Sequence, residues 1–275
     1  MSDAAALSIR HVSKIYRTRQ GGVHAVDDCS LDIPARDFSV LVGPSGCGKT
    51  TLLNIAAGFD TLTTGEVRLG DAVIAAPGVA PSPGPDRVVV FQHGGLFPWM
   101  TTLENVCYGA VIQRHLTRPQ AVDAARALLA RVGLSGIERL YPGDVSSGMR
   151  RRVEIVRALI ARPRVLLMDE PFRALDALTK SIMHDFLLTL YDAEPYTIFF
   201  ITHDLIEALF LADRVAVMTT RPGRIKTILA VDLPRPRSYR ILSTPGFLRL
   251  KEQLMDAVHE EAVKAFEMGE RELAR

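Results

Sequence analysis

Residues 43–50 constrain the fold of this chain more than any other segment. They have the sequence Gly-Pro-Ser-Gly-Cys-Gly-Lys-Thr. The apolar run Phe38–Val42 before them predicts a buried strand, and apolar residues recur after them at helical spacing until Gly58. Glycines let a backbone curl with its N–H groups inward, and a helix that starts there aims its positive dipole end at the same point. The segment therefore predicts a Walker A loop, which binds phosphate groups.

Two side chains of this loop have specific predicted roles. Lys49 is expected to reach the β- and γ-phosphates, and the hydroxyl of Thr50 is expected to bind Mg²⁺. The alternative is a glycine-rich turn that merely precedes a helix, but the complete pattern is far more specific than isolated glycines. The predicted nucleotide-binding residues of the segment are Gly43, Pro44, Ser45, Gly46, Cys47, Gly48, Lys49, Thr50 and Thr51.

Composition limits the classes of partner. The chain has 275 residues and a formal net charge of +2, so it lacks the strongly basic balance of a nucleic-acid binder, and no nucleic-acid partner is expected. Its three cysteines are far apart without the spacing of zinc ligands, which fits a reducing cytosol. We expect no signal peptide at residues 1–11, and no run approaches the roughly 18 apolar residues of a membrane span. Any role at a membrane is therefore expected to need a partner.

The first part of the chain has the pattern of strands. Alternating apolar and polar residues predict two antiparallel strands, Leu7–Tyr16 and His24–Ile33, separated by a loop at Arg17–Val23. Further strands are predicted at Gly65–Leu69, Ala72–Ile74 and Val88–Phe91. Three helices then follow without an intervening strand, which predicts a helical insertion: Thr102–His115, Gln120–Val132 and Ser147–Ala161.

Strands and helices alternate again after this insertion. The predicted elements are the strands Val165–Met168, Tyr196–Ile201 and Val215–Met218 and the helix Lys180–Asp192. This order is typical of a parallel sheet covered by helices. A last helix, Gly246–Met268, is expected to dock on the core through Leu250, Leu254, Val258 and Ala262. We predict a discontinuous core domain of residues 1–91 and 162–235, a helical domain of residues 92–161 and a tail of residues 236–275.

Polar residues follow the predicted parallel strands where a phosphate site needs them. In the Walker B arrangement after Val165–Met168, Asp169 is expected to hold Mg²⁺ and Glu170 to orient or deprotonate the attacking water. Paired acids after a strand can instead cap a helix, but the Walker A loop favours the metal site. His203 is predicted to touch the γ-phosphate and Gln92 to coordinate Mg²⁺ or the water, although either residue alone is compatible with a purely structural role.

The segment before Walker B carries a family resemblance. Val145–Met149, with the Arg-Arg-Arg-Val that follows, resembles the signature motif of ABC ATPases, which normally has the sequence Leu-Ser-Gly-Gly-Gln. Pro171–Asp176 resembles the D-loop of this family. Three single residues resemble its other motifs: Gln92 the Q-loop, His203 the switch histidine and Tyr16 the aromatic that stacks on adenine. Without the family, Tyr16 is equally an aromatic residue of an edge strand.

The resemblance implies a fold and an assembly. The fold class is α/β, the P-loop NTPase fold of ABC ATPases with an antiparallel β subdomain and an inserted helical subdomain. Two ATPase subunits are expected to close on two ATP molecules with Mg²⁺, each placing its signature motif over the nucleotide of the other. The nucleotide-binding residues that the resemblance adds are Tyr16, Ser146, Ser147, Gly148 and Asp176. The chain is thus expected to be an enzyme that hydrolyses ATP.

Two longer segments, residues 91–106 and 221–225, are similar to the nitrate, sulfonate and taurine group of ABC importers. Such importers imply transmembrane permease subunits, a substrate-binding protein that supplies the solute, and a location on the cytoplasmic face of the inner membrane. The apolar residues within Gly94–Tyr108, namely Leu96, Phe97, Trp99 and Met100, predict a groove for a permease helix. The alternative is a core patch between subdomains. The transported compound is selected by the partner proteins.

Three positions depart from the family pattern. Ser147 and Arg173 each replace a usual glycine, and Arg151 replaces a common glutamine. If position 147 needs a glycine conformation, the strain costs about 1–3 kcal/mol. We therefore expect an active ATPase with a weakened signature motif, paired with an identical or a different ATPase subunit. Two other classes stay open: an ABC ATPase that acts outside transport, and a catalytically silent regulatory subunit.

Overall fold

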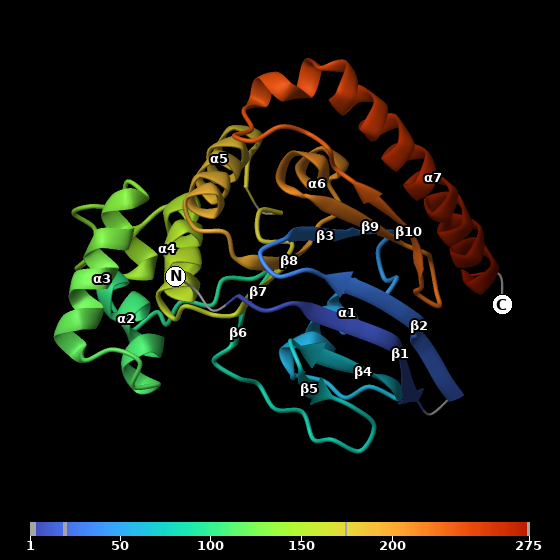
Figure 1. The fold of residues 1–275 in the computed structure, drawn as a ribbon, viewed down its shortest axis with the longest axis horizontal. Helices are drawn as coiled ribbons and strands as arrows, with labels where there is room; N and C mark the ends of the chain where they lie inside the picture. Colours follow the sequence, from blue (N-terminus) through green and yellow to red (C-terminus); the bar gives the residue numbers. More distant parts are fainter. Residues whose placement is uncertain (1–3, 19–20, 174, 274–275) are drawn as a thin grey trace.

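A six-stranded sheet forms the centre of the computed structural model, which describes residues 4–18, 21–173 and 175–273 (Figure 1). Its strand order is β10-β9-β3-β8-β7-β6, and every neighbouring pair is parallel except β10 with β9. The strands are β3 (Phe38–Val42), β6 (Arg87–Val90), β7 (Val165–Asp169), β8 (Thr197–Ile201), β9 (Arg214–Met218) and β10 (Ile225–Ala230). Because β3, β7 and β8 are covered on both faces, all their residues are buried and apolar runs dominate them.

A second sheet is antiparallel and has the order β2-β1-β4-β5. Its strands are β1 (Leu7–Thr18), β2 (Gly21–Ile33), β4 (Thr64–Leu69) and β5 (Ala72–Ala75). The predicted loop at Arg17–Val23 is wrong in extent, because Arg17 pairs with Gly22 and Thr18 with Gly21. These strand ends are exposed, so backbone pairing continues there without the apolar alternation that marks a strand in the sequence. The turn itself, residues 19–20, lies outside the described residues.

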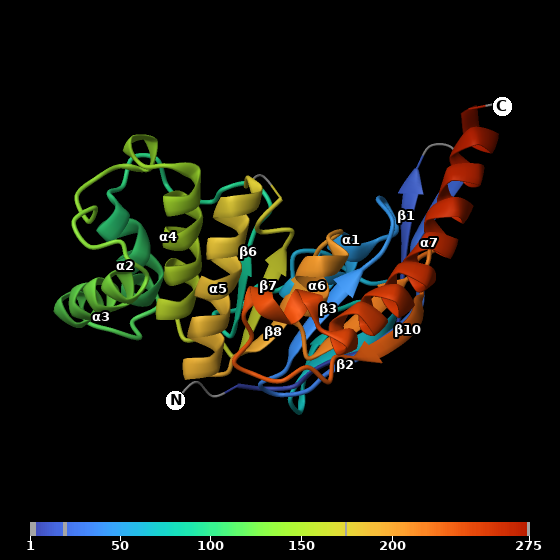
Figure 2. The same cartoon turned by 90° about the horizontal axis from the view of Figure 1, so that it is seen from above.

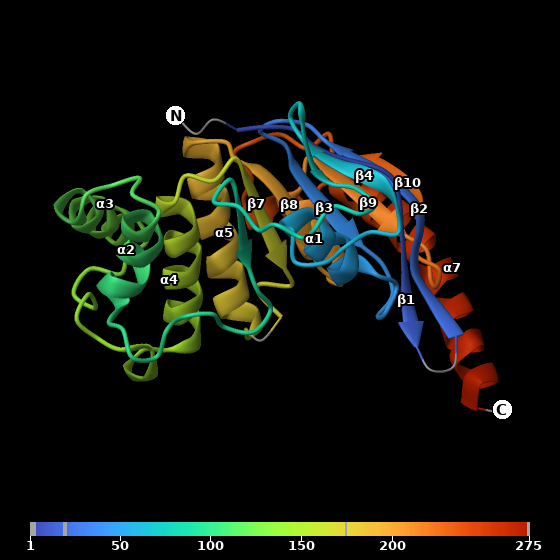
Figure 3. The same cartoon turned by 90° about the horizontal axis from the view of Figure 1, so that it is seen from below.

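Helices separate and cover the two sheets. α1 (Lys49–Ala57) lies between them, and its Leu52 and Ile55 share a buried cluster with Leu7 of β1 and Leu167 of β7 (Figure 3). The opposite face of the central sheet is covered by α5 (Ala177–Ala193), α6 (Leu205–Leu211) and α7 (Pro245–Leu273). This stacking leaves the beginning of α1 at the edge where the parallel strands end.

Three helices form a separate bundle beside β6 and β7 (Figure 2). They are α2 (Thr102–Ile112), α3 (Arg118–Arg131) and α4 (Ser147–Ile160). One short 3₁₀ helix, Pro142–Asp144, precedes α4 in the chain, and a second, Tyr239–Ser243, precedes α7. The bundle has its own buried cluster, which includes Val106, Ala110, Ala125, Leu129, Val153 and Val156. The predicted fold class, with an antiparallel β subdomain and a helical insertion, is confirmed, while the exact domain limits stay a prediction. Within the described ranges, no helix is both long and apolar enough to cross a membrane.

The C-terminal helix docks on the core as expected, but with one different contact. Leu254 is buried and Leu250 and Val258 are half-buried, whereas Ala262 is exposed. Glu261 takes the buried position instead, with 2% of its surface exposed. The apolar pattern failed at this turn because α7 passes over polar groups there, namely Thr220 of the β9–β10 connection and Lys226 of β10.

Candidate nucleotide site

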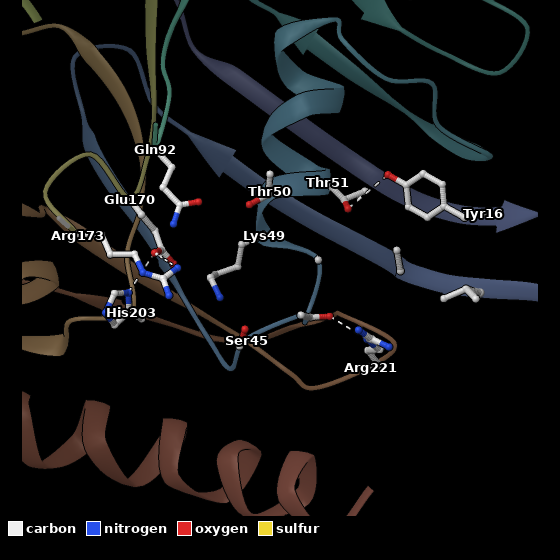
Figure 4. A pocket seen from close by; sticks show the side chains of 14 residues that line it. Tyr16, Ser45, Lys49, Thr50, Thr51, Gln92, Glu170, Arg173, His203 and Arg221 are labelled. Carbon is white, nitrogen blue, oxygen red and sulfur yellow. Dashed lines mark hydrogen bonds and ion pairs between the residues drawn. The ribbon is translucent and has the colours of Figure 1, made fainter. Parts of the chain in front are cut away.

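A pocket of about 610 Å³ opens at the edge of the central sheet where the parallel strands end (Figure 4). Its lining residues are Tyr16, Val23, Ala25, Ser45, Gly46, Gly48, Lys49, Thr50, Thr51, Gln92, Glu170, Arg173, His203 and Arg221. Gly43 and Cys47 complete the loop behind this lining and are buried. The lining joins segments that are far apart in the chain, and Val23, Ala25, Arg173 and Arg221 are absent from the predicted set.

The backbone of the Walker A loop requires its glycines. Gly46 and Gly48 have left-handed backbone conformations, with φ of +74° and +103°. A Cβ atom on Gly48 would lie 2.6 Å from the carbonyl oxygen of Ala25 on β2, closer than real contacts allow. Gly48 is the N-cap residue of α1 and offers no side chain to the first N–H groups of the helix. These donors are therefore free to bind an anion in the pocket.

Lys49 is buried in the loop, with 7% of its surface exposed. Its Nζ donates to the carbonyl oxygens of Gly43 at 2.8 Å and Pro44 at 2.9 Å. These partners are neutral dipoles, so they orient the ammonium group without cancelling its charge. A buried cation of this kind favours an anionic ligand, and the phosphate chain of a nucleotide is such a ligand.

Thr50 and Asp169 meet at the back of the pocket, where Oγ1 of Thr50 donates to Oδ2 of Asp169 over 3.0 Å. Burial raises the pKa of Asp169 above its ordinary value, the Thr50 hydrogen bond opposes this, and the charge of Glu170 adds to it. A hard cation beside this carboxylate would stabilise its charged form. Both side chains offer oxygen atoms, which are the ligands that Mg²⁺ takes. The described residues contain no group of three or more His, Cys, Asp or Glu side chains that could hold a metal. The oxygen donors of Thr50 and Asp169 fit a hard cation such as Mg²⁺.

Glu170 and His203 converge because β7 and β8 are parallel neighbours that end at one edge. Nδ1 of His203 lies 3.3 Å from Oε2 of Glu170. The same oxygen accepts a hydrogen bond of 3.1 Å from Nη1 of Arg173, whose side chain is 59% exposed. Glu170 itself has a φ of +42°, a conformation uncommon for residues other than glycine and frequent at functional sites. Gln92 lies beside this group on the same wall of the pocket (Figure 4).

Tyr16 lies at the far end of the pocket from Glu170. Its hydroxyl donates to Oδ2 of Asp60 at 2.6 Å, and Nζ of Lys14 lies 4.7 Å from the ring centroid. Burial and the hydrogen bond to Asp60 raise the pKa of the phenol, so it remains a donor. The ring is 38% exposed and lines the pocket, which fits a stacking contact with a planar base.

The predicted residues of the signature motif and the D-loop are not among the lining residues of this pocket. Ser146 caps α4 by accepting a hydrogen bond from the N–H of Met149, and Asp176 caps α5 by accepting one from the N–H of Thr179. Gly148 joins the two helix starts, since a Cβ there would lie 2.8 Å from Cγ2 of Thr179. Ser147 is the first helical residue of α4, and its φ is not in the left-handed region. The backbone strain expected if position 147 needed a glycine conformation is therefore absent.

Arg151, a departure from the family pattern, connects α4 to the segment that carries Gln92. Its guanidinium donates to the carbonyl oxygens of Phe91 and Gln92, each at 2.8 Å, and pairs with Glu154 at 2.6 Å. Glu154 in turn accepts a hydrogen bond from the N–H of Gly95. Sequence reasoning missed these contacts, because charged residues at helical spacing give no sign of which backbone they will meet.

Fold and site together define an ATP-binding P-loop protein, and known proteins identify its family. The family model described as ABC transporter matches residues 26–173. Similar curated proteins are the bicarbonate transport ATP-binding protein of Synechocystis sp. (42% identity, 93% of this chain and 89% of that one), the nitrate import ATP-binding protein of the same organism (39%, 90% and 93%) and the taurine import ATP-binding protein of Rhizobium johnstonii (40%, 92% and 96%). The chain therefore belongs to the ABC transporter family, as one of its ATPases.

A solved structure agrees with this assignment. A dimeric bacterial ABC transporter cassette is similar with a TM-score of 0.71 and 26% identity, covering 83% of this chain and 100% of that one. The ABC ATPase fold predicted from the motifs is thereby confirmed.

Proposed function

We propose that this chain hydrolyses ATP to drive an importer for a small solute such as nitrate, a sulfonate or taurine. It works from the cytoplasmic face of the inner membrane, bound to a permease. A substrate-binding protein delivers the solute to this permease. The names of the curated relatives support the solute class. The observation that carries the proposal is the division of the predicted residues. Lys49, Glu170 and His203 line one pocket, whereas Ser146 and Ser147 are exposed at the start of α4 and are not among its lining residues.

This division supports a working pair of ATPase subunits. The N-terminus of α4 presents Ser146 and Ser147, both exposed, and its N–H groups and dipole favour an anion. In a pair, this surface of one subunit covers the γ-phosphate in the pocket of the other. Asp176 at the start of α5 lies beside it and belongs to the same contact. Each nucleotide site is then complete only in the pair.

Within the pocket, each side chain has a defined task. Lys49 and the N–H groups of the loop hold the β- and γ-phosphates, and Tyr16 stacks on the base. Thr50, Asp169 and Gln92 would hold Mg²⁺, which would neutralise charge on the phosphate oxygens. Glu170 accepts a proton from the attacking water, and His203 orients the carboxylate of Glu170 and contacts the γ-phosphate.

Replacing Arg173 with glycine is expected to raise the rate of ATP hydrolysis about 1.5- to 5-fold. Arg173 and His203 both occupy Oε2 of Glu170, so the ion pair must break before that oxygen takes a proton from water. An exposed ion pair of this kind contributes about 0.2–1 kcal/mol, which sets the size of the effect. The measurement is the kcat of the assembled complex, with Arg173→Lys as the control that keeps the charge. A slower Arg173→Gly variant would show that Arg173 assists hydrolysis instead.

A groove of about 700 Å³ on the helical bundle fits a permease helix. Trp99 and Met100 line it, and Trp99 is 70% exposed. The buried amide of Asn105 fixes the segment that carries Trp99, since it bonds the backbone oxygens of Phe97, Met100 and Thr101. The predicted groove residues fall into two groups. Leu96 packs against the core of the bundle, whereas Trp99 lies outside this core.

Trp99→Ala tests the coupling to a permease. Transport by the complex with its permease and binding protein, reconstituted in vesicles, is expected to fall about tenfold or more, because a large aromatic anchor is lost from the centre of the contact. Basal ATP hydrolysis and the unfolding temperature of the isolated chain are expected to stay unchanged. Phe266→Ala, which removes an aromatic side chain that is 68% exposed on α7, is the matched control. Unfolding of the Trp99 variant would instead indicate a core role, and unchanged transport would remove the groove from the coupling.

A further inference from the structure

The connection between β9 and β10 holds the Walker A loop from outside the pocket. Nε of Arg221 donates to the carbonyl oxygen of Gly46 over 3.0 Å. The guanidinium lies over Gly46 so closely that a Cβ atom there would be 3.0 Å from Nη2. Arg221 also lines the pocket, on the wall opposite Gln92 and Glu170 (Figure 4). It thus fixes one peptide of the loop and adds positive charge where phosphates would lie.

Gly223 places this connection in close contact with both neighbours of the pocket. Its N–H donates to the carbonyl oxygen of Ala25, and its own carbonyl oxygen accepts from the N–H of Asp27 at 2.9 Å. A Cβ atom on Gly223 would lie 2.0 Å from the carbonyl oxygen of Cys47. The connection therefore fills the space between β2 and the Walker A loop and contacts both.

The other end of the connection is held by α7 through Glu261. Oε2 of Glu261 accepts a hydrogen bond of 3.0 Å from the N–H of Thr220, the residue before Arg221. Oε1 lies 2.7 Å from Nζ of Lys264 and 3.2 Å from Nζ of Lys226. Burying a charged carboxylate costs free energy unless its oxygens are paired, and Glu261 is 98% buried. Its pairing with Thr220 therefore holds α7 against the connection. Burial alone would raise the pKa of Glu261, but its hydrogen bonds hold that pKa below the ordinary value, so the group stays charged.

We propose that Glu261, acting through Thr220 and Arg221, positions the Walker A loop, so that the C-terminal helix sets the affinity of the pocket for ATP. Arg221 and Glu261 are positioning residues for this loop. The inference rests on the proposed function, because it takes ATP as the ligand of the pocket. It gives a role to α7, for which the sequence alone indicates only a helix docked on the core.

The test compares neighbouring residues of like charge, of which one contacts Thr220 or Gly46 and the other does not. Glu261→Ala removes the acceptor of Thr220, whereas Glu260→Ala removes a carboxylate that pairs with the same Lys226 but is 63% exposed and does not hold Thr220. Arg221→Ala removes the contact with Gly46, whereas Arg224→Ala removes an arginine of the same connection that pairs with Asp27. The full-length chain is titrated with a fluorescent ATP analogue, and kcat, KM and unfolding temperature are measured in parallel.

Arg221→Ala and Glu261→Ala are each expected to weaken ATP binding about five- to tenfold, and Glu261→Ala, which lies outside the pocket, is expected to change kcat at saturating ATP less than about twofold. The controls Glu260→Ala and Arg224→Ala are expected to bind ATP like the wild type. Since the two positioning residues act in series, the double variant is expected to bind no more weakly than Arg221→Ala alone. Glu261→Gln keeps an acceptor for Thr220 and is expected to give an intermediate affinity, and it carries the test if Glu261→Ala does not fold.

Three results would overturn the inference. Equal affinities of the Glu261 and Glu260 variants would show that α7 does not act on the loop. Additive losses in the double variant would show that the two residues act separately. A lower unfolding temperature with unchanged ATP affinity would show a purely structural role. A wild-type chain that binds no ATP would instead overturn the proposed function itself, so the two failures are distinguishable.

Discussion

Glu170→Gln is expected to bind ATP with nearly normal affinity and to hydrolyse it at least about 100-fold more slowly than the wild type. The amide keeps the size of the carboxylate and can still accept the hydrogen bond from Arg173, but it cannot take a proton from water. A general base contributes about 100- to 10,000-fold to a rate, which sets the lower bound. The measurements are single-turnover ATP hydrolysis and nucleotide affinity in the assembled complex.

Glu252→Gln is a suitable control, since Glu252 is exposed on α7 and lies outside the pocket. ATP stays intact in the Glu170 variant. In the presence of ATP, the isolated variant chain is therefore also expected to accumulate as the closed pair of subunits, with twice the mass of one chain. A wild-type rate of hydrolysis by Glu170→Gln would show that another residue is the general base. Loss of binding together with hydrolysis would indicate that the variant disturbs the loop rather than the chemistry.

Lys49→Ala is expected to lose ATP binding by about 30-fold or more and to lose turnover in the assembled complex altogether. The substitution removes the buried ammonium group that is available to the phosphates, and it leaves the carbonyl oxygens of Gly43 and Pro44 without their donor. Truncating a buried, hydrogen-bonded charge costs about 2–5 kcal/mol, equivalent to the stated loss of affinity at its lower end.

Titration with a fluorescent ATP analogue and a steady-state ATPase assay measure both effects. Lys251→Ala, on α7 and outside the pocket, serves as the control for removing a lysine. Circular dichroism establishes that the Lys49 variant is folded. Retained full turnover would contradict the assignment of this pocket as the hydrolysis site.

The parts of the site that could be predicted are those fixed by local chemistry or by the ends of parallel strands. The Walker A loop is contiguous, and its glycines are required by the backbone that the loop adopts, as at Gly46 and Gly48. Glu170 and His203 lie far apart in the chain, yet both follow buried apolar strands. Since neighbouring parallel strands end at one edge, their convergence followed from the pattern alone.

The residues that could not be predicted reach the site by longer routes. Arg221 comes from a connection whose place depends on Gly223 fitting between β2 and the loop, a contact that no periodicity indicates. Glu261 is a charged residue in a buried stripe, because its neighbours across the helix interface are polar. Arg173 could be recognised as unusual for the family, but its partner Glu170 is identified only by the folded backbone.

The contact between Arg151 and the backbone of Phe91 and Gln92 has a consequence for the pair of subunits. In the proposed pair, one helix, α4, presents Ser146 at its start to the other subunit and holds the segment of Gln92 little more than one turn later. In the proposed pair, α4 therefore links the Gln92 wall of one pocket to the surface that covers the pocket of the other subunit.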